Sequence, residues 1–171
     1  MRFGDFLRST VLLSAGSATL LAALTIIGLS QESDGTLTLF SAFWWAGAIL
    51  IGIWLGRRGE TSPPIRRLLL GARSQTMLPE LRPSTTLINR LWPLLFATLG
   101  AALMSVFEPQ VSGVAAGFSI IWALAWRRQA SAVAAIEERD GVRFYVDRTS
   151  PLQPIRLIRT PGFGGSYLKH P

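Results

Sequence analysis

The chain of 171 residues contains no cysteine and only one histidine, His170. Disulfides, thiolate chemistry and cysteine-based metal sites are therefore excluded, and one chain cannot form a histidine pair or a serine–histidine couple. A group of carboxylates occurs only within residues 137–140, beside Arg139 and Arg143, which is a pattern typical of a solvated helix end. We therefore expect no catalytic residue, no metal site and no bound cofactor.

Charge is also scarce, since 16% of residues are charged and 49% are hydrophobic. Four stretches carry no charge at all: Ser9–Gln31, Gly35–Gly56, Leu91–Phe107 and Pro109–Trp126. About 20 apolar residues cross a hydrocarbon core of roughly 30 Å. None of these stretches has the polar face that a helix of a soluble bundle requires. The sequence predicts an all-α integral membrane protein with four transmembrane helices, arranged as two hairpins.

Basic residues are absent from the two turns that connect these segments. All 17 Lys and Arg fall in residues 1–8, in residues 57–90 or beyond Trp126, whereas the turns carry only Glu32, Asp34 and Glu108. The positive-inside rule then places both termini in the cytoplasm. Topology explains the net charge of +7, so we expect no nucleic-acid partner. The preference for arginine over lysine suggests a bacterial protein of the inner membrane.

These boundaries divide the chain into four parts. We expect a first transmembrane hairpin at 1–56, an arginine-rich cytoplasmic loop at 57–90, a second hairpin at 91–128 and a cytoplasmic tail at 129–171. Pro93 is expected in the first turn of the third segment, where a proline costs no hydrogen bond.

The two hairpins share a short sequence similarity. Residues 18–24 and 97–103 agree at six of seven positions. One interpretation is an internal duplication, which would give a 2+2 parallel repeat about an axis along the membrane normal. The other is coincidence between helices rich in alanine and leucine.

Small residues recur at four-residue spacing along all four segments. This spacing allows helix backbones to approach closely in lipid, so it predicts packing inside the bundle, or alternatively a homodimer face. The residues are Ala18, Ala22, Gly52, Gly56, Ala97, Ala101, Gly113 and Gly117.

The central loop contains an amphipathic segment after Pro63 and Pro64. Ile65, Leu68, Leu69 and Ala72 form an apolar stripe, which predicts a short interfacial helix with that stripe in the headgroup region. An ordinary basic loop is the alternative. We expect anionic lipid or a partner to meet the neighbouring arginines, which are Arg57, Arg58, Arg66, Arg67 and Arg73.

The pattern of the tail predicts a helix followed by a β-hairpin and a mobile end. Helical pattern continues through residues 129–139, Asp140–Gly141 interrupts it, and Val142–Arg148 alternates with strand periodicity. Residues 155–159 are expected to pair with this strand. A lone hairpin is marginal in water. The face formed by Val142, Phe144 and Val146 therefore needs cover from the tail helix, the central loop, another copy or a partner.

No ionisable residue lies well inside the four segments, which disfavours ion-coupled transport. We expect a non-enzymatic scaffold or accessory/assembly subunit that presents a basic cytoplasmic platform to anionic lipid headgroups, a protein partner or copies of itself. The alternative is a small oligomeric channel or carrier. An enzyme acting on lipid headgroups is a third interpretation, for which acid–base groups are scarce.

Overall fold

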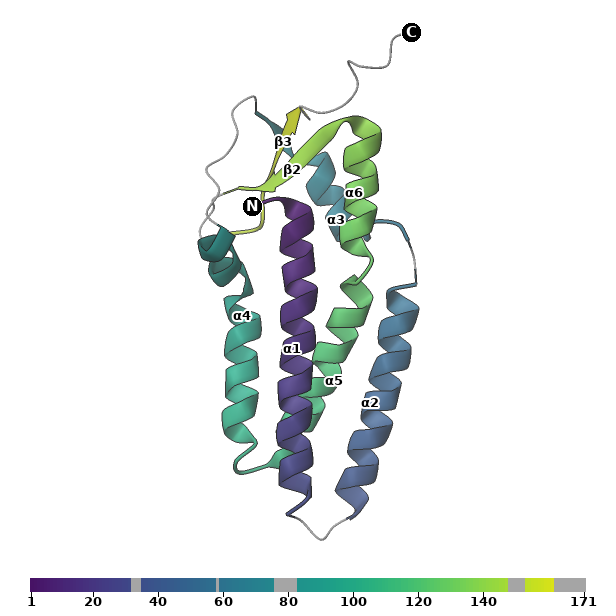
Figure 1. Cartoon of the computed structure of the whole chain (residues 1–171), viewed down its shortest axis with the longest axis vertical. Helices are drawn as coiled ribbons and strands as arrows, with labels where there is room; N and C mark the ends of the chain where they lie inside the picture. Colours follow the sequence, from purple (N-terminus) through teal and green to yellow (C-terminus); the bar gives the residue numbers. More distant parts are fainter. Residues whose placement is uncertain (32–34, 58, 76–82, 148–152, 162–171) are drawn as a thin grey trace.

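The computed structural model describes residues 1–31, 35–57, 59–75, 83–147 and 153–161. It is mostly helical, with a small sheet at one end (Figure 1). The elements are α1 (Phe3–Leu29), α2 (Gly35–Leu55), α3 (Pro63–Leu70), β1 (Arg73–Ser74), α4 (Pro83–Met104), α5 (Pro109–Trp126), α6 (Gln129–Asp140), β2 (Val142–Val146) and β3 (Leu157–Pro161).

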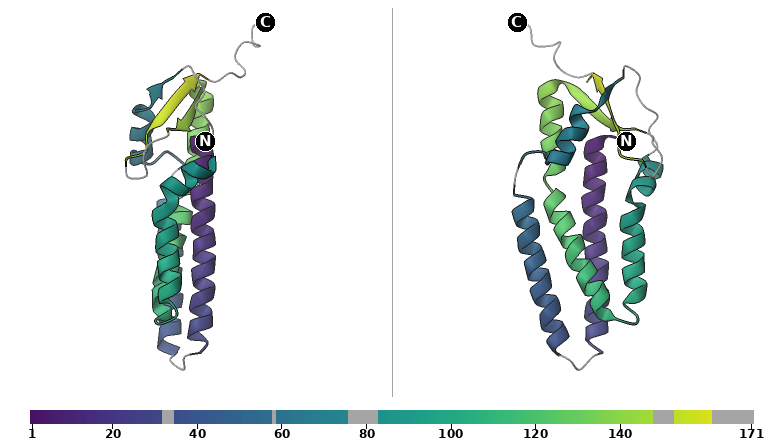
Figure 2. Two further views of the ribbon diagram at one scale, coloured as in Figure 1. Left: turned by 90° about the vertical axis from the view of Figure 1, so that its left-hand side faces the viewer. Right: turned by 180° about the vertical axis from the view of Figure 1, so that it is seen from behind.

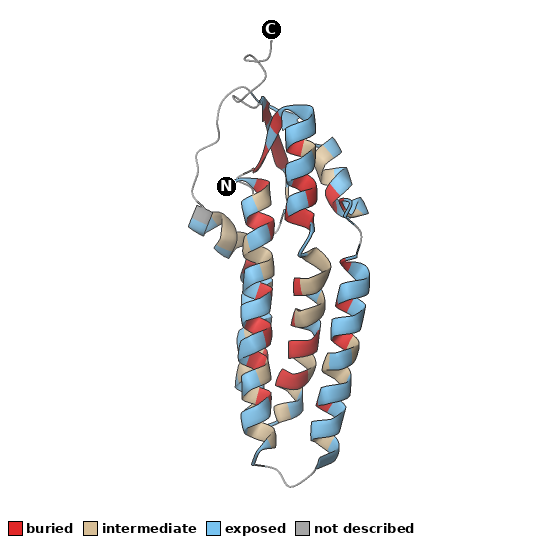
Figure 3. Cartoon of the chain, turned by 45° about the vertical axis from the view of Figure 1, so that its right-hand side comes forward, coloured by how far each residue is buried: buried red, intermediate tan, exposed pale blue. Residues whose placement is uncertain are grey.

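Four helices are long and apolar enough to cross a membrane, and they lie side by side (Figure 1). Many of their large apolar side chains are exposed, and few residues of α2 and α4 are buried. Exposed residues run along the length of α2 in Figure 3. A soluble bundle would bury such side chains, whereas hydrocarbon accepts them. The four apolar helices therefore indicate a multi-pass membrane protein. Examples of these outward side chains are Leu12, Leu20, Ile26, Phe40, Phe43, Leu50, Phe96 and Leu103.

Helix α5 is the centre of the bundle. It packs extensively against α1 and α2 and more lightly against α4, while α1 and α2 contact each other little. A duplication with two-fold symmetry would place α2 against α4 in the way that α1 lies against α5. The contact between α2 and α4 is slight at most. The packing thus lacks the symmetry that a 2+2 parallel repeat requires.

The third membrane helix begins earlier than the sequence suggested. Helix α4 starts at Pro83, so Pro93 lies inside the helix and the expectation of a first-turn proline is wrong. A proline there has no amide to donate to the carbonyl four residues before it, and its ring crowds that turn. The helix changes direction in its upper part (Figure 2). Residues 83–90, assigned from sequence to the central loop, are therefore the start of α4.

The far end of the molecule carries a folded unit that we call the cap. It comprises the described residues from Arg57 to Gln75 and from Gln129 to Pro161, which include α3, β1, α6, β2 and β3, together with the first turns of α1. Its sheet has the order β1-β3-β2. Strands β2 and β3 pair antiparallel, as the tail pattern predicted, although β3 begins at Leu157 and not at residue 155. Phe144 lies opposite Arg159. Strand β1 adds parallel to β3, and the Val146 amide donates to the Met1 carbonyl at 3.0 Å. The sheet thus joins three distant parts of the chain.

The helix of the tail ends where the sequence predicted. Helix α6 stops at Asp140, and Gly141 has φ 61°, a left-handed conformation that glycine adopts without strain. This turn reverses the chain directly into β2. Helix α6 therefore lies beside the strand that follows it (Figure 1).

The apolar stripe of α3 faces the cap core and not the lipid headgroups, so that part of the interfacial-helix expectation is wrong. Ile65 is 1% exposed, and Leu68, Leu69 and Ala72 pack against the same cluster. The physical reason is that the sheet needs cover on its apolar face, and protein is already there to provide it. The buried members of this cluster are Met1, Phe3, Phe6, Leu7, Ile65, Leu91, Ala130, Val133, Val142, Phe144, Val146 and Leu157.

Candidate functional site

The arginines of the proposed platform lie on the surface. Arg57, Arg66, Arg67 and Arg73 are all exposed, and Arg58 lies outside the described residues. Arg66 pairs with Glu60 at 3.4 Å, with both side chains mostly in solvent. Such an exposed pair contributes little to stability. These arginines are therefore exposed to solvent and contribute little to the folded core.

The tail face for which an interaction was predicted is covered within the chain itself. Val142, Phe144 and Val146 all belong to the cap core. Of the alternatives for covering the hairpin, the tail helix and the central loop both contribute, through Val133 and Ile136 of α6 and through α3. The first turns of α1 also contribute, which the sequence analysis missed. The apolar face is not available to another protein.

The carboxylates at the end of α6 serve structural roles. The Glu137 side chain is 7% exposed and accepts the Phe144 amide at 2.8 Å, and Arg143 lies 3.4 Å from its other oxygen. Asp140 accepts Arg139 Nε at 2.8 Å on the surface. Glu137 therefore anchors β2 to α6. Within the described residues, no group of three or more His, Cys, Asp or Glu side chains is placed to hold a metal ion.

The glycines predicted to mediate packing lie where helices approach most closely. A Cβ at Gly52 would lie 2.8 Å from the Leu124 Cβ, and one at Gly56 would overlap the Leu124 carbonyl oxygen. On α5, a Cβ at Gly113 would lie 3.1 Å from the Thr25 methyl group, and one at Gly117 would overlap the Trp44 indole. An added side chain at Gly52, Gly56 or Gly117 would force a neighbour to move, and one at Gly113 would be tightly packed, so these glycines allow the close approach of α1, α2 and α5.

The alanines of the same pattern are less uniform. Ala18 and Ala101 are buried, and Ala22 and Ala101 belong to a small cluster around Leu21 and Ala116. Ala97 is exposed on α4. Helix α4 thus uses its small residues only near its far end.

Two tryptophans that the sequence analysis did not assign to packing join α2 to α5. Trp44 Nε1 donates to the Val114 carbonyl at 3.1 Å, and Trp45 Nε1 donates to the Gly113 carbonyl at 2.8 Å. Indole nitrogens need an acceptor when they lie away from water. A tryptophan pair in the middle of an apolar segment, with two glycines four residues apart on another segment, is the signal that would have predicted this contact.

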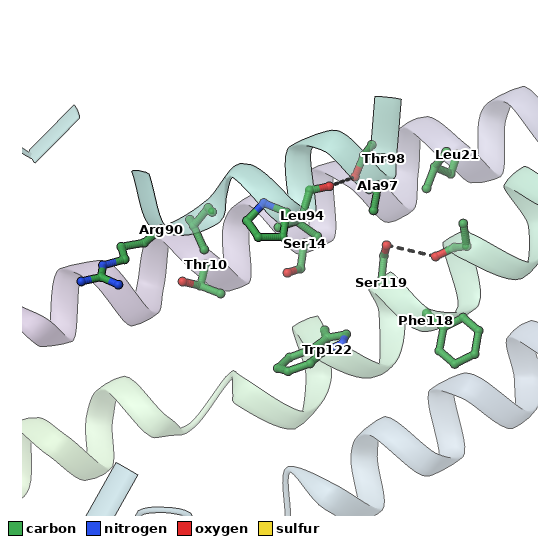
Figure 4. A pocket seen from close by; sticks show the side chains of 13 residues that line it. Thr10, Ser14, Leu21, Arg90, Leu94, Ala97, Thr98, Phe118, Ser119 and Trp122 are labelled. Atoms are coloured by element: carbon green, nitrogen blue, oxygen red, sulfur yellow. Dashed lines mark hydrogen bonds between the residues drawn. The ribbon is translucent and has the colours of Figure 1, made fainter. Parts of the chain in front are cut away.

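An apolar cavity of about 500 Å³ lies between α1, α4 and α5 (Figure 4). Hydroxyl groups of Thr10, Ser14 and Ser119 line it, and Trp122 forms part of its wall. Arg90 lies at one end, where its guanidinium donates to the Gln153 carbonyl of the cap. Its volume falls within the roughly 300–1,000 Å³ range of ligand sites. The light packing of α4 against α1 and α5 leaves this space between the three helices.

Comparisons of this chain with models of protein families, with curated proteins and with solved structures found no match.

Proposed function

We propose that this protein is a non-enzymatic scaffold or accessory subunit of a bacterial inner membrane, with both termini and the cap in the cytoplasm. In this proposal, its four helices cross the membrane as two hairpins. The cap then presents a basic platform to anionic lipid headgroups, a protein partner or a second copy. The observation that carries the proposal is the set of exposed arginines Arg57, Arg66, Arg67 and Arg73, held on a cap whose own apolar core is filled.

Charge supports a binding role for this platform. A cluster of basic residues beside a membrane helix attracts anionic headgroups, with about 1 kcal/mol for each residue near the surface. The same residues supply charge-assisted hydrogen bonds to carboxylates of a protein partner. Because the arginines do not fill the core, they are free to act in binding without disturbing the fold.

The proposal is tested by crosslinking in native membranes followed by mild detergent extraction. We expect the intact chain to recover a partner or an oligomer, and a variant with Arg57, Arg66, Arg67 and Arg73 all changed to Gln to lose it. A control variant with Arg156→Gln and Arg159→Gln, also exposed on the cap, should retain it. Deleting the tail is a poor test because Val142–Val146 fills the core. A strictly monomeric protein without crosslinks would contradict the proposal.

A small oligomeric channel or carrier is the second candidate, and the cavity between α1, α4 and α5 is the observation that favours it. Its apolar wall suits a hydrophobic cargo better than an ion. Efflux of a hydrophobic dye from proteoliposomes, compared with protein-free liposomes, measures this function. Equal rates in the two preparations would dismiss it.

A further inference from the structure

A pocket of about 550 Å³ lies where the end of α2 meets α3 and α6, and we call it the α2–α3 pocket. It is lined by Trp54, Leu55 and Arg57 at the end of α2, by Glu60 and Arg66 around the start of α3, and by Gln129 of α6. Apolar, basic and acidic groups thus meet in one place at the edge of the bundle.

The walls of this pocket are held by hydrogen bonds from α6. The Gln129 side chain accepts the Ser62 amide at 2.9 Å and donates to the Glu60 carbonyl at 3.4 Å. Arg128 donates to the Arg57 carbonyl at 3.0 Å. The chain between α2 and α3 is therefore tied to Arg128 and to Gln129 at the start of α6. These hydrogen bonds fix the backbone from which the Arg57 and Arg66 side chains extend.

The position of the pocket corresponds to the boundary between hydrocarbon and headgroups. Trp54 and Leu55 are the last residues of an apolar helix, and Trp54 is 64% exposed. Tryptophan rings concentrate at this level of a membrane protein. The outward side chains of Leu50 and Ile51 continue along α2 away from the cap. A molecule that entered the pocket with a polar group would thus find an apolar track for its chains.

The charges of the pocket favour a phosphate. Arg57 and Arg66 supply two guanidinium groups from two elements, against the single carboxylate of Glu60. The Arg66–Glu60 pair is 3.4 Å apart and mostly in solvent, so it is weak and easily exchanged. Guanidinium groups bind phosphate oxygens with short, charge-assisted hydrogen bonds.

We propose that the α2–α3 pocket binds the headgroup of an anionic phospholipid from the surrounding bilayer, with its phosphate between Arg57 and Arg66 and its acyl chains along α2. This inference rests on the proposed function and assigns lipid recognition to two of the platform arginines. Arg67 and Arg73 do not line the pocket. The lipid is recognised by a built pocket and not by insertion of the α3 stripe, which is buried in the cap.

The test is native mass spectrometry of the full chain released from bilayers that contain equal amounts of phosphatidylglycerol, phosphatidylethanolamine and phosphatidylcholine. We expect phosphatidylglycerol to be retained preferentially. The variant Arg57→Gln/Arg66→Gln should lower this preference roughly thirty-fold, since each basic group contributes about a five-fold effect. The variant Arg67→Gln/Arg73→Gln carries the same change in charge and should retain most of the preference.

Three outcomes would overturn the inference. Equal loss in both double variants would show attraction by overall charge and no particular site. Preference for phosphatidylethanolamine would show that the ligand is zwitterionic, and preference for no lipid would show that the pocket does not bind one. A thermal unfolding curve confirms that each variant is folded. Crosslinking to a partner is measured separately, so the proposed function can fail while this lipid site stands, and the reverse.

Discussion

Gly117 is a position in the membrane helices where an added side chain would meet a large neighbouring ring. Its Cα lies so close to Trp44 that an added methyl group would overlap the indole, and that indole also donates to the Val114 carbonyl. Gly47, in contrast, has no atom within 4 Å of the position that a Cβ would occupy. The two glycines therefore separate the effect of packing from the effect of helix propensity.

We predict that Gly117→Ala destabilises the protein by about 1–3 kcal/mol, the usual cost of forcing an extra carbon into a packed interior. Gly47→Ala should be neutral or slightly stabilising, because alanine favours a helix by up to about 1 kcal/mol over glycine. Unfolding in mixed micelles, followed by circular dichroism as dodecyl sulfate is added, measures both. Similar stability of the two variants would contradict the close contact of α2 with α5.

A polar contact joins α1 and α5, where the hydroxyl oxygens of Thr25 and Ser112 lie 2.8 Å apart. Both residues are fully buried, and each hydroxyl also contacts a carbonyl of its own helix. Such local partners weaken the dependence of one hydroxyl on the other. A double-mutant cycle with Thr25→Val and Ser112→Ala should give a coupling of about 0.6 kcal/mol, typical of hydrogen bonds between membrane helices. A coupling above about 2 kcal/mol would indicate a cooperative polar network instead.

The observed environment of helix α3 differs more from the prediction than that of any other element described above. Its apolar stripe packs on the first turns of α1 and on the sheet, whereas Leu70 at its end is 81% exposed. If the stripe lay among lipid headgroups, trimming either kind of residue would have little effect on the fold. Because the stripe lies in the cap core, the two kinds should differ strongly.

We predict that Ile65→Ala lowers the free energy of unfolding by about 2–5 kcal/mol, as for other large-to-small changes in a core. The matched change Leu70→Ala should stay within about 0.5 kcal/mol of the parent chain. Limited proteolysis of the cap in detergent is a second measure, with faster cleavage expected only for Ile65→Ala. Equal effects of Ile65→Ala and Leu70→Ala would contradict burial of the α3 stripe and would favour a position in the membrane interface.

The elements that the sequence predicted are those with a local signal. Each membrane helix contains a run of apolar residues without charge, and β2 shows the alternation of a half-buried strand. The helix end at Asp140 follows from Gly141. Strand β1 has only Arg73 and Ser74, too short for any periodicity, and its place is decided by a partner at Ile158, far along the chain.

Burial at the candidate site was unpredictable for a related reason. The alternation of Val142, Phe144 and Val146 shows that this face is covered, but it does not show what covers it. The cover comes from Phe3 and Ile65, which belong to other parts of the chain. Nothing in the sequence around either residue indicates that it contacts this strand. The exposure of Arg57, Arg66, Arg67 and Arg73 was easier to predict, because an exposed charge needs no partner within the fold.

The cap and the bundle share helices and are therefore joined as one unit. Helix α1 runs from the cap core to the opposite end of the bundle, and α6 follows α5 with only a short interruption (Figure 2). The cap therefore lies at a fixed position against the ends of the spans. Arginines on the cap and Glu108 at the other end give the described part of the molecule a charge asymmetry along its length. This asymmetry is the physical basis for its orientation in the proposed function.

The orientation is tested by labelling single cysteines, which is clean here because the chain has none of its own. Gln31 and Gln110 are exposed at the end away from the cap, and Arg73 is exposed on the cap. With a maleimide that does not cross the inner membrane, Gln31→Cys and Gln110→Cys should react in whole cells whose outer membrane is permeable. Arg73→Cys should react only after the inner membrane is opened, because the arginine-rich side is retained in the cytoplasm. The reverse pattern would invert the orientation. Equal labelling at all three positions without opening the membrane would contradict a single orientation across it. The cap arginines would then not be confined to the cytoplasmic side.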